Sequence, residues 1–268
     1  MSVLRIFSYL PNPRIWKATI AARLAGVEVE VRGAAPGELQ GWLWDFDARP
    51  LTDGDRAGLR DLERAPKTGF REKPLYKTEA FLDAHPFGTV PAAFSPDGKT
   101  GVFESNSIMR AVARLGGGGL YGRDPYEASR IDGFLDAGVV FGRDAQLYLF
   151  SLSDGSVPAE LHARAGAAFA AYVGGVDRAL AADRRFIVGD TLSLADICFV
   201  AELCLFSNER PRQGALRQRG LAPVFGENAR ADFPRAMAHF ETLCAHPAFA
   251  PDTGPYMEKL ARAAAKAA

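Results

Sequence analysis

The sequence predicts an α/β domain followed by an all-helical domain, and three features of the chain lead to this fold class. Residues 1–115 open on a strand, a helix and a second strand in close succession. A glycine-rich stretch over residues 116–125 then interrupts the hydrophobic pattern. Beyond it, four long segments with helical periodicity follow without a strand pattern between them, which is typical of a bundle. We therefore expect one domain over residues 1–115 and a second over residues 116–268.

Hydrophobic periodicity predicts the opening elements. Residues 4–8 form an apolar run of strand length, and residues 14–24 repeat apolar side chains at the spacing of one helix face. Gly26 is a natural helix end, and the alternating residues 27–31 predict a second strand. A strand, a helix and a strand in this order predict a parallel βαβ unit.

A long insertion over about residues 34–73 follows the second strand. It is rich in Gly, Pro, Asp and Arg, and it exceeds the few residues usual for such a connection. We expect either a functional lid or an insertion with its own helix around residues 55–64. Trp42, Trp44 and Phe46 alternate within it, and they either anchor the insertion on the domain, which we favour, or cover an apolar substrate pocket.

The hydrophobic pattern recovers after the insertion. Residues 78–84 predict a short helix, and residues 92–94 and 101–103 predict two strands. Asp97-Gly98 between the two strands predicts a hairpin turn. A helix is then expected from about Asn106 to Leu115.

Composition limits the classes of function. The 268 residues contain 32 basic and 32 acidic side chains, so no net field favours nucleic acid or an anionic membrane. No apolar run approaches the roughly 20 residues that span a bilayer, and Met1-Ser2-Val3 leads into a strand rather than a secretory signal. We expect a cytoplasmic protein that binds neither nucleic acid nor membrane. The three cysteines lack the spacing of metal ligands, so we interpret Cys244 as a core residue and expect no metal.

The most informative motif joins HPFGTVPAAF to VFESNSIMR a few residues later. We expect a cis Val90-Pro91 bond, because a proline before an apolar run suits a turn that enters a strand. Such a turn leaves the main chain of Val90 open to an extended peptide. Glu104 and Ser105 stand where a helix begins: its free amides and dipole hold a carboxylate, and an acidic side chain holds an ammonium. Glu104 and Ser105 also suit a plain helix start. A ligand that carries a carboxylate and an ammonium on one carbon, next to a short peptide, is glutathione with its γ-glutamyl end.

The chain resembles the cytosolic glutathione transferases over nearly its whole length. The most specific segments are FGTVPA, FESNSI and FIVGDTLSLADI. The opening IFSYLPNPRIWKATIAA, the triplet ESN and the late DFPRAMAHFETLCAHPAF look most like the transferase-like domain of the gamma subunit of a eukaryotic translation elongation factor. The resemblance implies a thioredoxin-like first domain that binds glutathione, an all-helical second domain and a homodimer.

The resemblance also implies the catalytic residues. The family places a thiol-activating side chain after the first strand, because the glutathione thiol, with a pKa of about 8.5, must be held as thiolate near neutral pH. Alignment through the following helix puts Asn12 at or beside this position, with Ser8 and Tyr9 as competing donors. Asn12 before Pro13 is also a complete helix cap, and one asparagine can serve both roles.

Further glutathione contacts are implied in the second half of the first domain. The expected glutathione-binding residues are Lys77, Val90, Pro91, Glu104, Ser105 and Asn106. Lys77 lies in YKTEAFL, which resembles the segment that holds the glycine carboxylate of glutathione in many relatives. An alternative interpretation, that Lys77 is a solvated lysine on a short polar helix, is equally open.

The second domain is expected to hold the substrate. Its helices are predicted at residues 126–149, 158–182, 192–206 and 233–245. Ser193 and Asp196 fit a capping box with a role in folding. We expect Phe141, Tyr148 and Phe206 to line a substrate pocket, and the alanine-rich tail LARAAAKAA to fray.

The function implied by the resemblance is that of a glutathione transferase. Such an enzyme uses glutathione as co-substrate, without a metal, to attack a small apolar electrophile. Two alternatives stay open: a non-catalytic interaction module like the elongation-factor domain, and a glutathione-dependent disulfide reductase or peroxidase.

Overall fold

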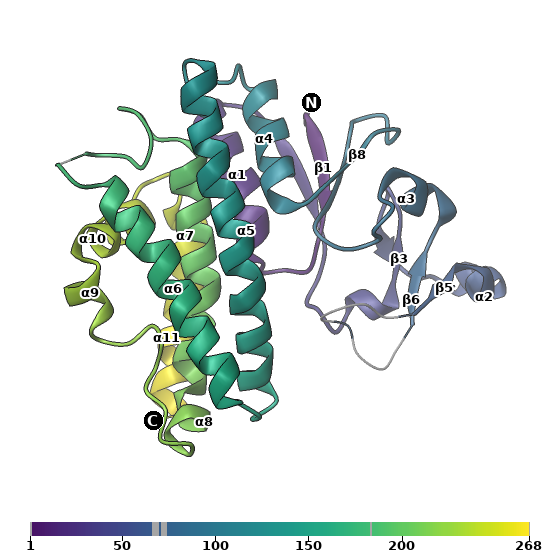
Figure 1. The fold of residues 1–268 in the computed structure, drawn as a ribbon. Helices are drawn as coiled ribbons and strands as arrows, with labels where there is room; N and C mark the ends of the chain where they lie inside the picture. The colour runs from purple at the N-terminus through teal and green to yellow at the C-terminus, as the bar shows by residue number, and fades with distance from the viewer. Residues whose placement is uncertain (1, 66–69, 71–73, 183, 268) are drawn as a thin grey trace. The chain divides into compact units, whose positions relative to one another are not determined.

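The chain divides into two compact units, Met1–Gly118 and Gly119–Ala268. The computed structural model describes residues 2–65, 70, 74–182 and 184–267 (Figure 1). Among these residues strands occur only in the first unit, and the long helices form the second. The predicted fold class, an α/β thioredoxin-like domain plus an all-helical bundle, is confirmed. Parts of the predicted insertion, residues 66–69 and 71–73, lie outside the described residues.

The first unit is built on a four-stranded sheet in the order β2-β1-β7-β8, which we call the main sheet. Its strands are β1 (Leu4–Phe7), β2 (Val29–Arg32), β7 (Ala92–Phe94) and β8 (Gly101–Phe103). β1 runs parallel to β2 and antiparallel to β7, and β7 runs antiparallel to β8. The predicted βαβ unit and hairpin are therefore confirmed. Two helices, α1 (Pro13–Ala25) and α4 (Ser105–Leu115), pack against each other (Figure 1).

The segment between β2 and β7 differs from the expectation, because it forms a second four-stranded sheet in the order β4-β3-β6-β5. Its strands are β3 (Trp42–Trp44), β4 (Arg49–Pro50), β5 (Glu63–Arg64) and β6 (Leu75–Lys77). The short helices of this segment are η1 (Leu39–Gly41), η2 (Asp53–Gly58), α2 (Leu59–Leu62) and α3 (Glu79–Ala84). The helix expected near residues 55–64 is thus split between η2 and α2. Strands of two or three residues are too short for alternation to be visible in the sequence.

An aromatic core joins the two sheets. Trp44 of β3 is buried, with its ring centroid 5.2 Å from that of Phe7 on β1 and 6.1 Å from that of Phe81 on α3. Its indole nitrogen donates to the carbonyl of Leu39 at 3.0 Å. Phe46 packs edge-on against Phe94 of β7, at 5.9 Å between centroids. The interpretation that these aromatic side chains anchor the insertion is therefore confirmed.

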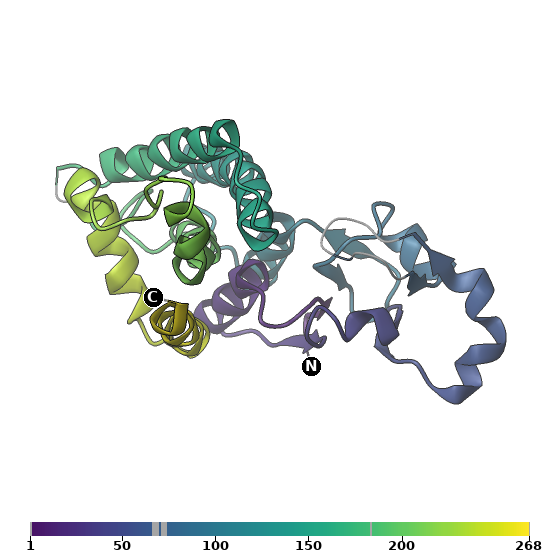
Figure 2. The ribbon, with the colours of Figure 1, turned by 90° about the horizontal axis from the view of Figure 1, so that it is seen from below.

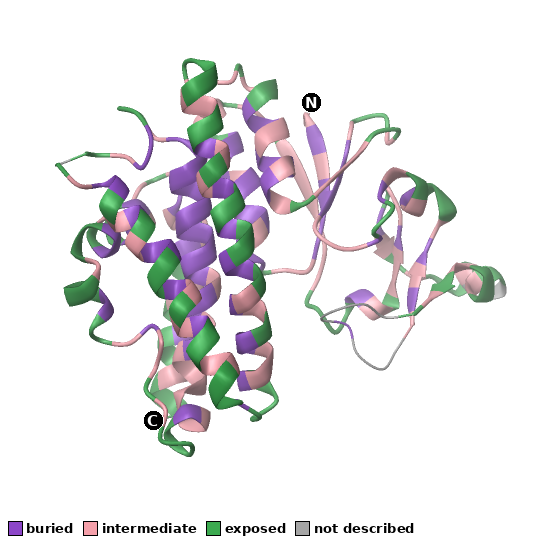
Figure 3. Ribbon diagram, viewed as in Figure 1, coloured by how far each residue is buried: buried purple, intermediate pink, exposed green. Residues whose placement is uncertain are grey.

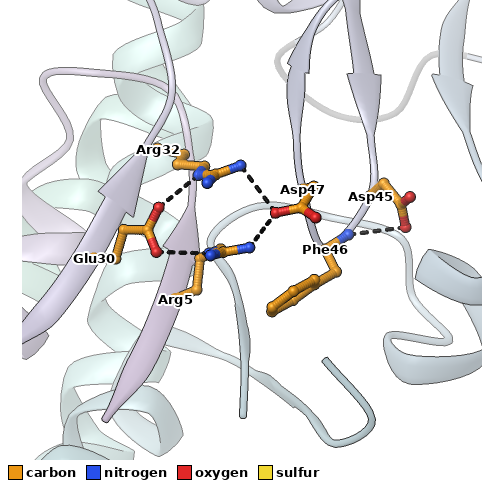
Figure 4. A network of polar contacts seen from close by, with 6 residues as sticks. All are labelled: Arg5, Glu30, Arg32, Asp45, Phe46 and Asp47. Carbon is orange, nitrogen blue, oxygen red and sulfur yellow. Dashed lines mark hydrogen bonds and ion pairs between the residues drawn. The ribbon is translucent and has the colours of Figure 1, made fainter. Parts of the chain in front are cut away.

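Charged side chains reinforce the same junction on its solvent side (Figure 4). Glu30 on β2 accepts from Arg5 and from Arg32, each at 2.7 Å. Both arginines also contact Asp47 in the turn after β3, and the Arg5 guanidinium lies 4.2 Å from the centroid of the Phe46 ring. The hydrogen bonds from Arg5 and then Arg32 lower the pKa of Glu30 below its usual value. Because the network is partly exposed, we expect it to orient the turn more than to stabilise the fold.

The second unit is a helical bundle around α7 (Leu194–Phe206). Every residue of α7 except Leu205 is buried, which Figure 3 shows as a nearly continuous buried ribbon. In the view of Figure 2, α7 is surrounded by the other long helices of the unit. These are α5 (Pro125–Ser153), α6 (Ala159–Ala179), α10 (Pro234–Cys244) and α11 (Ala250–Ala267), with shorter turns η3 (Ser207–Arg212), α8 (Gln213–Arg217) and α9 (Ala229–Asp232). Apart from Asp196 and Glu202, the side chains of α7 are apolar on every side, which suits such a central position.

Polar anchors fix α7 at its start. The predicted capping box is confirmed, because Asp196 accepts from the Ser193 amide at 2.9 Å while Ser193 caps the helix. Asp196 is fully buried and also accepts from the Ile187 amide at 3.1 Å and contacts His239 of α10 at 2.8 Å. The carboxylate therefore ties three segments together, which the capping motif alone does not indicate.

The expectation for the C-terminal tail is wrong. Residues Ala250–Ala267 form the helix α11 rather than a frayed end. Leu260 and Thr253 of this helix are buried, and α11 packs against η3. The alanine-rich composition suits a helix on intrinsic propensity, and these contacts stabilise it.

We predict that Trp44→Ala destabilises the first unit by about 3–5 kcal/mol, because it removes a buried ring that contacts both sheets. Trp42→Ala is the matched control, since Trp42 is only half-buried and stacks on Phe7 at 6.0 Å. Urea unfolding followed by circular dichroism measures both changes. Equal losses for the two variants would contradict the assignment of Trp44 as the anchor.

Candidate functional site

Three consecutive strands of the main sheet end side by side. Phe7, the last residue of β1, pairs with Ala92, the first of β7, and Ala92 pairs with Phe103, the last of β8. The residues one step beyond these pairs are Ser8, Pro91 and Glu104. Neighbouring strands lie about 4.8 Å apart, so this register brings three predicted site residues to one edge of the sheet.

The Val90-Pro91 turn enters this edge. The predicted cis bond is confirmed, and a second cis bond at Leu10-Pro11, which was not predicted, lies in the loop after β1. Val90 and Pro91 are both half-buried. Both residues therefore keep part of their surface open to solvent at the end of β7.

Two helices begin at the same edge. α1 starts at Pro13, five residues after Ser8, and α4 starts at Ser105, next to Glu104. The first amides of an α-helix have no carbonyl partner within the helix, and the helix dipole makes this end favourable for an anion. Glu104 is exposed and makes no side-chain cap for α4. Its φ of 68° is in the left-handed region, which is unusual for a residue other than glycine and recurs at ligand-binding sites.

Asn12 and Ser8 form a pair inside the loop after β1. The Asn12 side-chain oxygen accepts from the Arg14 amide at 3.0 Å, which confirms the predicted cap. Its side-chain nitrogen donates to the Ser8 hydroxyl at 3.0 Å. Both residues are fully buried. Asn12 thus caps α1 and orients Ser8 at the same time.

Gly33 is a requirement of this edge that the sequence reading missed. A β-carbon at this position would lie 1.7 Å from the Ser8 carbonyl oxygen. The residue before Gly33 is Arg32, and its carbonyl accepts a hydrogen bond from the Ser8 amide at 3.1 Å. Only glycine therefore lets the chain leave β2 so close to the end of β1.

Lys17 is a second residue that the sequence analysis missed. It lies on α1, is 1% exposed, and donates to the Asn106 side-chain oxygen at 2.8 Å. Its ammonium is also 3.4 Å from the Ser105 hydroxyl. A buried ammonium at the start of α4 adds positive charge to the end of the helix that favours anions. The one signal in the sequence was a lysine on the apolar side of a predicted helix, directly after Trp16.

The local structure around Lys77 differs from the one expected from the sequence. It is the last residue of strand β6, not part of a polar helix, and it is 1% exposed, so the solvated alternative is wrong. Its ammonium donates to the Gly88 carbonyl at 2.6 Å and lies 4.9 Å from the centroid of the Trp44 ring. Lys77 therefore supports the turn that leads to Val90, and its contact with glutathione stays a prediction.

The residues predicted to line a substrate pocket lie together in the core of the second unit. Phe141, Tyr148 and Phe206 are each at most 2% exposed, and Phe206 stacks on the other two at centroid distances of 5.5 and 5.9 Å. The Tyr148 hydroxyl donates to buried Glu209 at 2.6 Å. Burial raises the pKa of Glu209, although the Tyr148 hydroxyl and two backbone amides that donate to it act in the opposite direction. Phe141, Tyr148 and Phe206 therefore form a cluster in the core. Their role as walls of a substrate pocket stays a prediction.

The described residues also give information on two other kinds of site. They contain no group of three His, Cys, Asp or Glu side chains placed to hold a metal ion. No helix among them is long and apolar enough to cross a membrane.

Comparison with known proteins gives consistent results for sequence and structure. Residues 147–247 match the family described as Glutathione S-transferase, C-terminal domain. A probable elongation factor 1-gamma 1 from Arabidopsis thaliana is 31% identical over 180 residues, covering 65% of this chain and 38% of the relative. An elongation factor 1-gamma from Trypanosoma cruzi is 37% identical over 121 residues, covering 42% of this chain and 26% of the relative. The chain thus spans well under half the length of both.

Solved structures agree on the fold. A glutathione S-transferase from Methylobacterium radiotolerans, crystallised in complex with glutathione sulfonate, superposes with a TM-score of 0.60 at 20% identity. The match covers 93% of this chain and 94% of that one. The class is therefore a two-unit protein with the glutathione transferase fold. The chain is similar in sequence to elongation factor 1-gamma, and part of its second unit matches the glutathione S-transferase C-terminal domain family.

We predict that Asn12→Ala lowers the free energy of unfolding by about 1–3 kcal/mol, because both the cap and the bond to Ser8 are lost. Asn12→Asp keeps a capping oxygen and loses only the donor, so its effect is expected to be smaller. Chemical denaturation of the two variants beside the unmodified protein measures the difference. A larger loss for Asn12→Asp would show that the cap contributes little.

Proposed function

We propose that the chain is a glutathione transferase whose first unit binds and activates glutathione. The observation that carries this proposal is the meeting of Ser8, Pro91 and Glu104 at one edge of the main sheet, next to the start of α4. The main chain at Val90 can pair with a peptide, and the first turn of α4 can hold a carboxylate. Glu104 can hold the adjacent ammonium. A relative of the same fold that was crystallised with glutathione sulfonate supports the choice of ligand.

In this proposal the buried Lys17 strengthens the carboxylate site. Its ammonium contacts Ser105 and Asn106, the first two residues of α4. Positive charge held behind the helix start adds to the helix dipole, and burial weakens the screening by water. Lys17 therefore acts as a positioning residue for the carboxylate of the γ-glutamyl group.

Ser8 is the donor that we propose for the glutathione thiolate. A hydroxyl has one proton to donate, and because the Ser8 oxygen already accepts from Asn12, that proton is free to point to another acceptor. A hydrogen bond to the thiolate stabilises the charged form, so the thiol loses its proton to solvent at a lower pH. The thiolate then attacks the electrophile and forms a carbon–sulfur bond. Asn12 keeps Ser8 in position.

The remaining parts of the proposal rest on family resemblance. We propose that Lys77 contributes to the site of the glycine carboxylate, and that the second unit binds a small apolar electrophile through Phe141, Tyr148 and Phe206. We also propose a cytoplasmic homodimer with the domain limits expected from the sequence. Sedimentation of the full chain at micromolar concentration tests the dimer, and a single monomeric species would remove it.

A second candidate is a non-catalytic interaction module. The sequence similarity to elongation factor 1-gamma from two organisms favours it. The full burial of both Ser8 and Asn12 also favours it, because a thiol needs access to its donor. Binding and turnover separate the two candidates: glutathione binding without conjugation of any of a panel of electrophiles supports the module, and a panel of disulfides and peroxides covers the reductase alternative.

We predict that Glu104→Gln and Ser105→Ala each weaken glutathione binding about tenfold or more. The removal of one partner from a charge-assisted contact costs on the order of 1.5–3 kcal/mol. Isothermal titration calorimetry measures the dissociation constants, and Glu38→Gln, which alters an exposed glutamate at the start of η1, is the matched control. Unchanged affinity in both variants would mean that Glu104 and Ser105 only start a helix.

We predict that Ser8→Ala raises the pKa of bound glutathione toward its free value of about 8.5 while binding is retained. Asn12→Ala should raise the pKa by a smaller amount, because Ser8 remains but is no longer held. Thiolate absorbance, titrated in the bound complex, reports the pKa of each variant, and Tyr9→Phe serves as the control. A shift for Asn12→Ala with none for Ser8→Ala would make Asn12 the donor.

A further inference from the structure

The second unit contains a cavity of its own. It has a volume of about 570 Å³ and is bordered by residues of η3, α10, α11 and the segment around α9. Phe225, Met237 and Phe240 give it buried apolar walls. Cys244, the last residue of α10, is partly exposed and also lines it.

A second thiol lies directly behind Cys244. Cys204 of α7 is fully buried, and its thiol is in hydrogen-bonding contact with the Cys244 thiol. That contact and, after it, burial raise the pKa of Cys204 well above its usual value. Both cysteines are free thiols in the structure. An accessible thiol backed by a buried one is the arrangement in which a mixed disulfide on the first can be resolved by the second.

The cavity also has a cation suited to an anionic ligand. The Arg210 guanidinium borders the cavity and lies 5.3 Å from the centroid of the Phe225 ring. At the rim, Arg230 forms an ion pair with Glu241, so its charge is partly compensated. Arginine binds carboxylates well, so Arg210 suits a ligand that carries a carboxylate.

We propose that Cys244 is a modification site that undergoes thiol–disulfide exchange with small disulfides bearing carboxylates, and that Cys204 is the resolving thiol. The Cys244 thiolate attacks one sulfur of the small disulfide, forms a mixed disulfide and releases one thiol. The Cys204 thiol then attacks the Cys244 sulfur and gives its proton to the departing thiolate, which forms the Cys204–Cys244 disulfide and releases the second thiol. Overall, two protein thiols are oxidised and one small disulfide is reduced to two thiols. The proposal uses the second unit and does not depend on the function of the first.

The test uses the reduced full chain and oxidised glutathione as the probe, with intact-mass and peptide mass spectrometry under non-reducing conditions. The unmodified chain should pass through a single glutathionyl adduct and end with the loss of two hydrogens, mapped to a Cys204–Cys244 link. Cys204→Ala should stop at the adduct on Cys244, and Cys244→Ser should take none. Cys198, which is fully buried on the same helix as Cys204, is the internal control and should stay unmodified.

Two further variants distinguish this reaction from other reactions with glutathione. Arg210→Gln should slow the reaction with oxidised glutathione several-fold and leave the reaction with uncharged hydroxyethyl disulfide unchanged. Glu104→Gln should react like the unmodified chain, which separates this proposal from glutathione binding by the first unit. Because the time course of the unmodified chain already reports both steps, a variant that fails to fold does not block the test. An adduct on Cys244→Ser equal to that on the unmodified chain, or a link that involves Cys198, would overturn the proposal.

Discussion

The pairing of β1 with β2 on one side and β7 on the other determines where the strand ends of the candidate site lie. The register Phe7–Ala92–Phe103 determines that Ser8, Pro91 and Glu104 stand together. Gly33 permits this arrangement, because a side chain there would overlap the Ser8 carbonyl. The sheet thus brings together residues separated by almost a hundred positions in the sequence, and a ligand can contact several loops at once.

The polar pairs around this edge each combine a structural role with the functional role that we propose for them. Asn12 caps α1 and holds Ser8, while Lys17 joins α1 to the first turn of α4. Buried polar groups of this kind are favourable only when their hydrogen bonds are made, so they specify one geometry. The second unit applies the same principle at Asp196, where one carboxylate joins α7, the loop before it and α10. Rigid supports of this type are what a binding site requires of its fold.

The sequence predicts those parts of the structure that depend on local chemistry. The cap at Asn12, the end of α1 at Gly26, the cis Val90-Pro91 bond and the capping box at Ser193 follow from a few neighbouring residues, and the structure confirms each. The second sheet was missed because its strands have only two or three residues and pair across long separations. For the same reason the burial of Lys77 and Lys17 and the contact between Cys204 and Cys244 could not be predicted. Their partners lie on other elements, and no local pattern records them.

We propose that the edge formed by Ser8, Pro91 and Glu104, with the first turn of α4, binds the γ-glutamyl end of glutathione. Amide chemical shifts of the ¹⁵N-labelled full chain during a glutathione titration test it most directly. We expect the largest changes at the amides of Val90, Ser105 and Asn106, with saturation at one ligand per chain. Changes confined to the second unit, or no saturable change at these three amides, would contradict the claim.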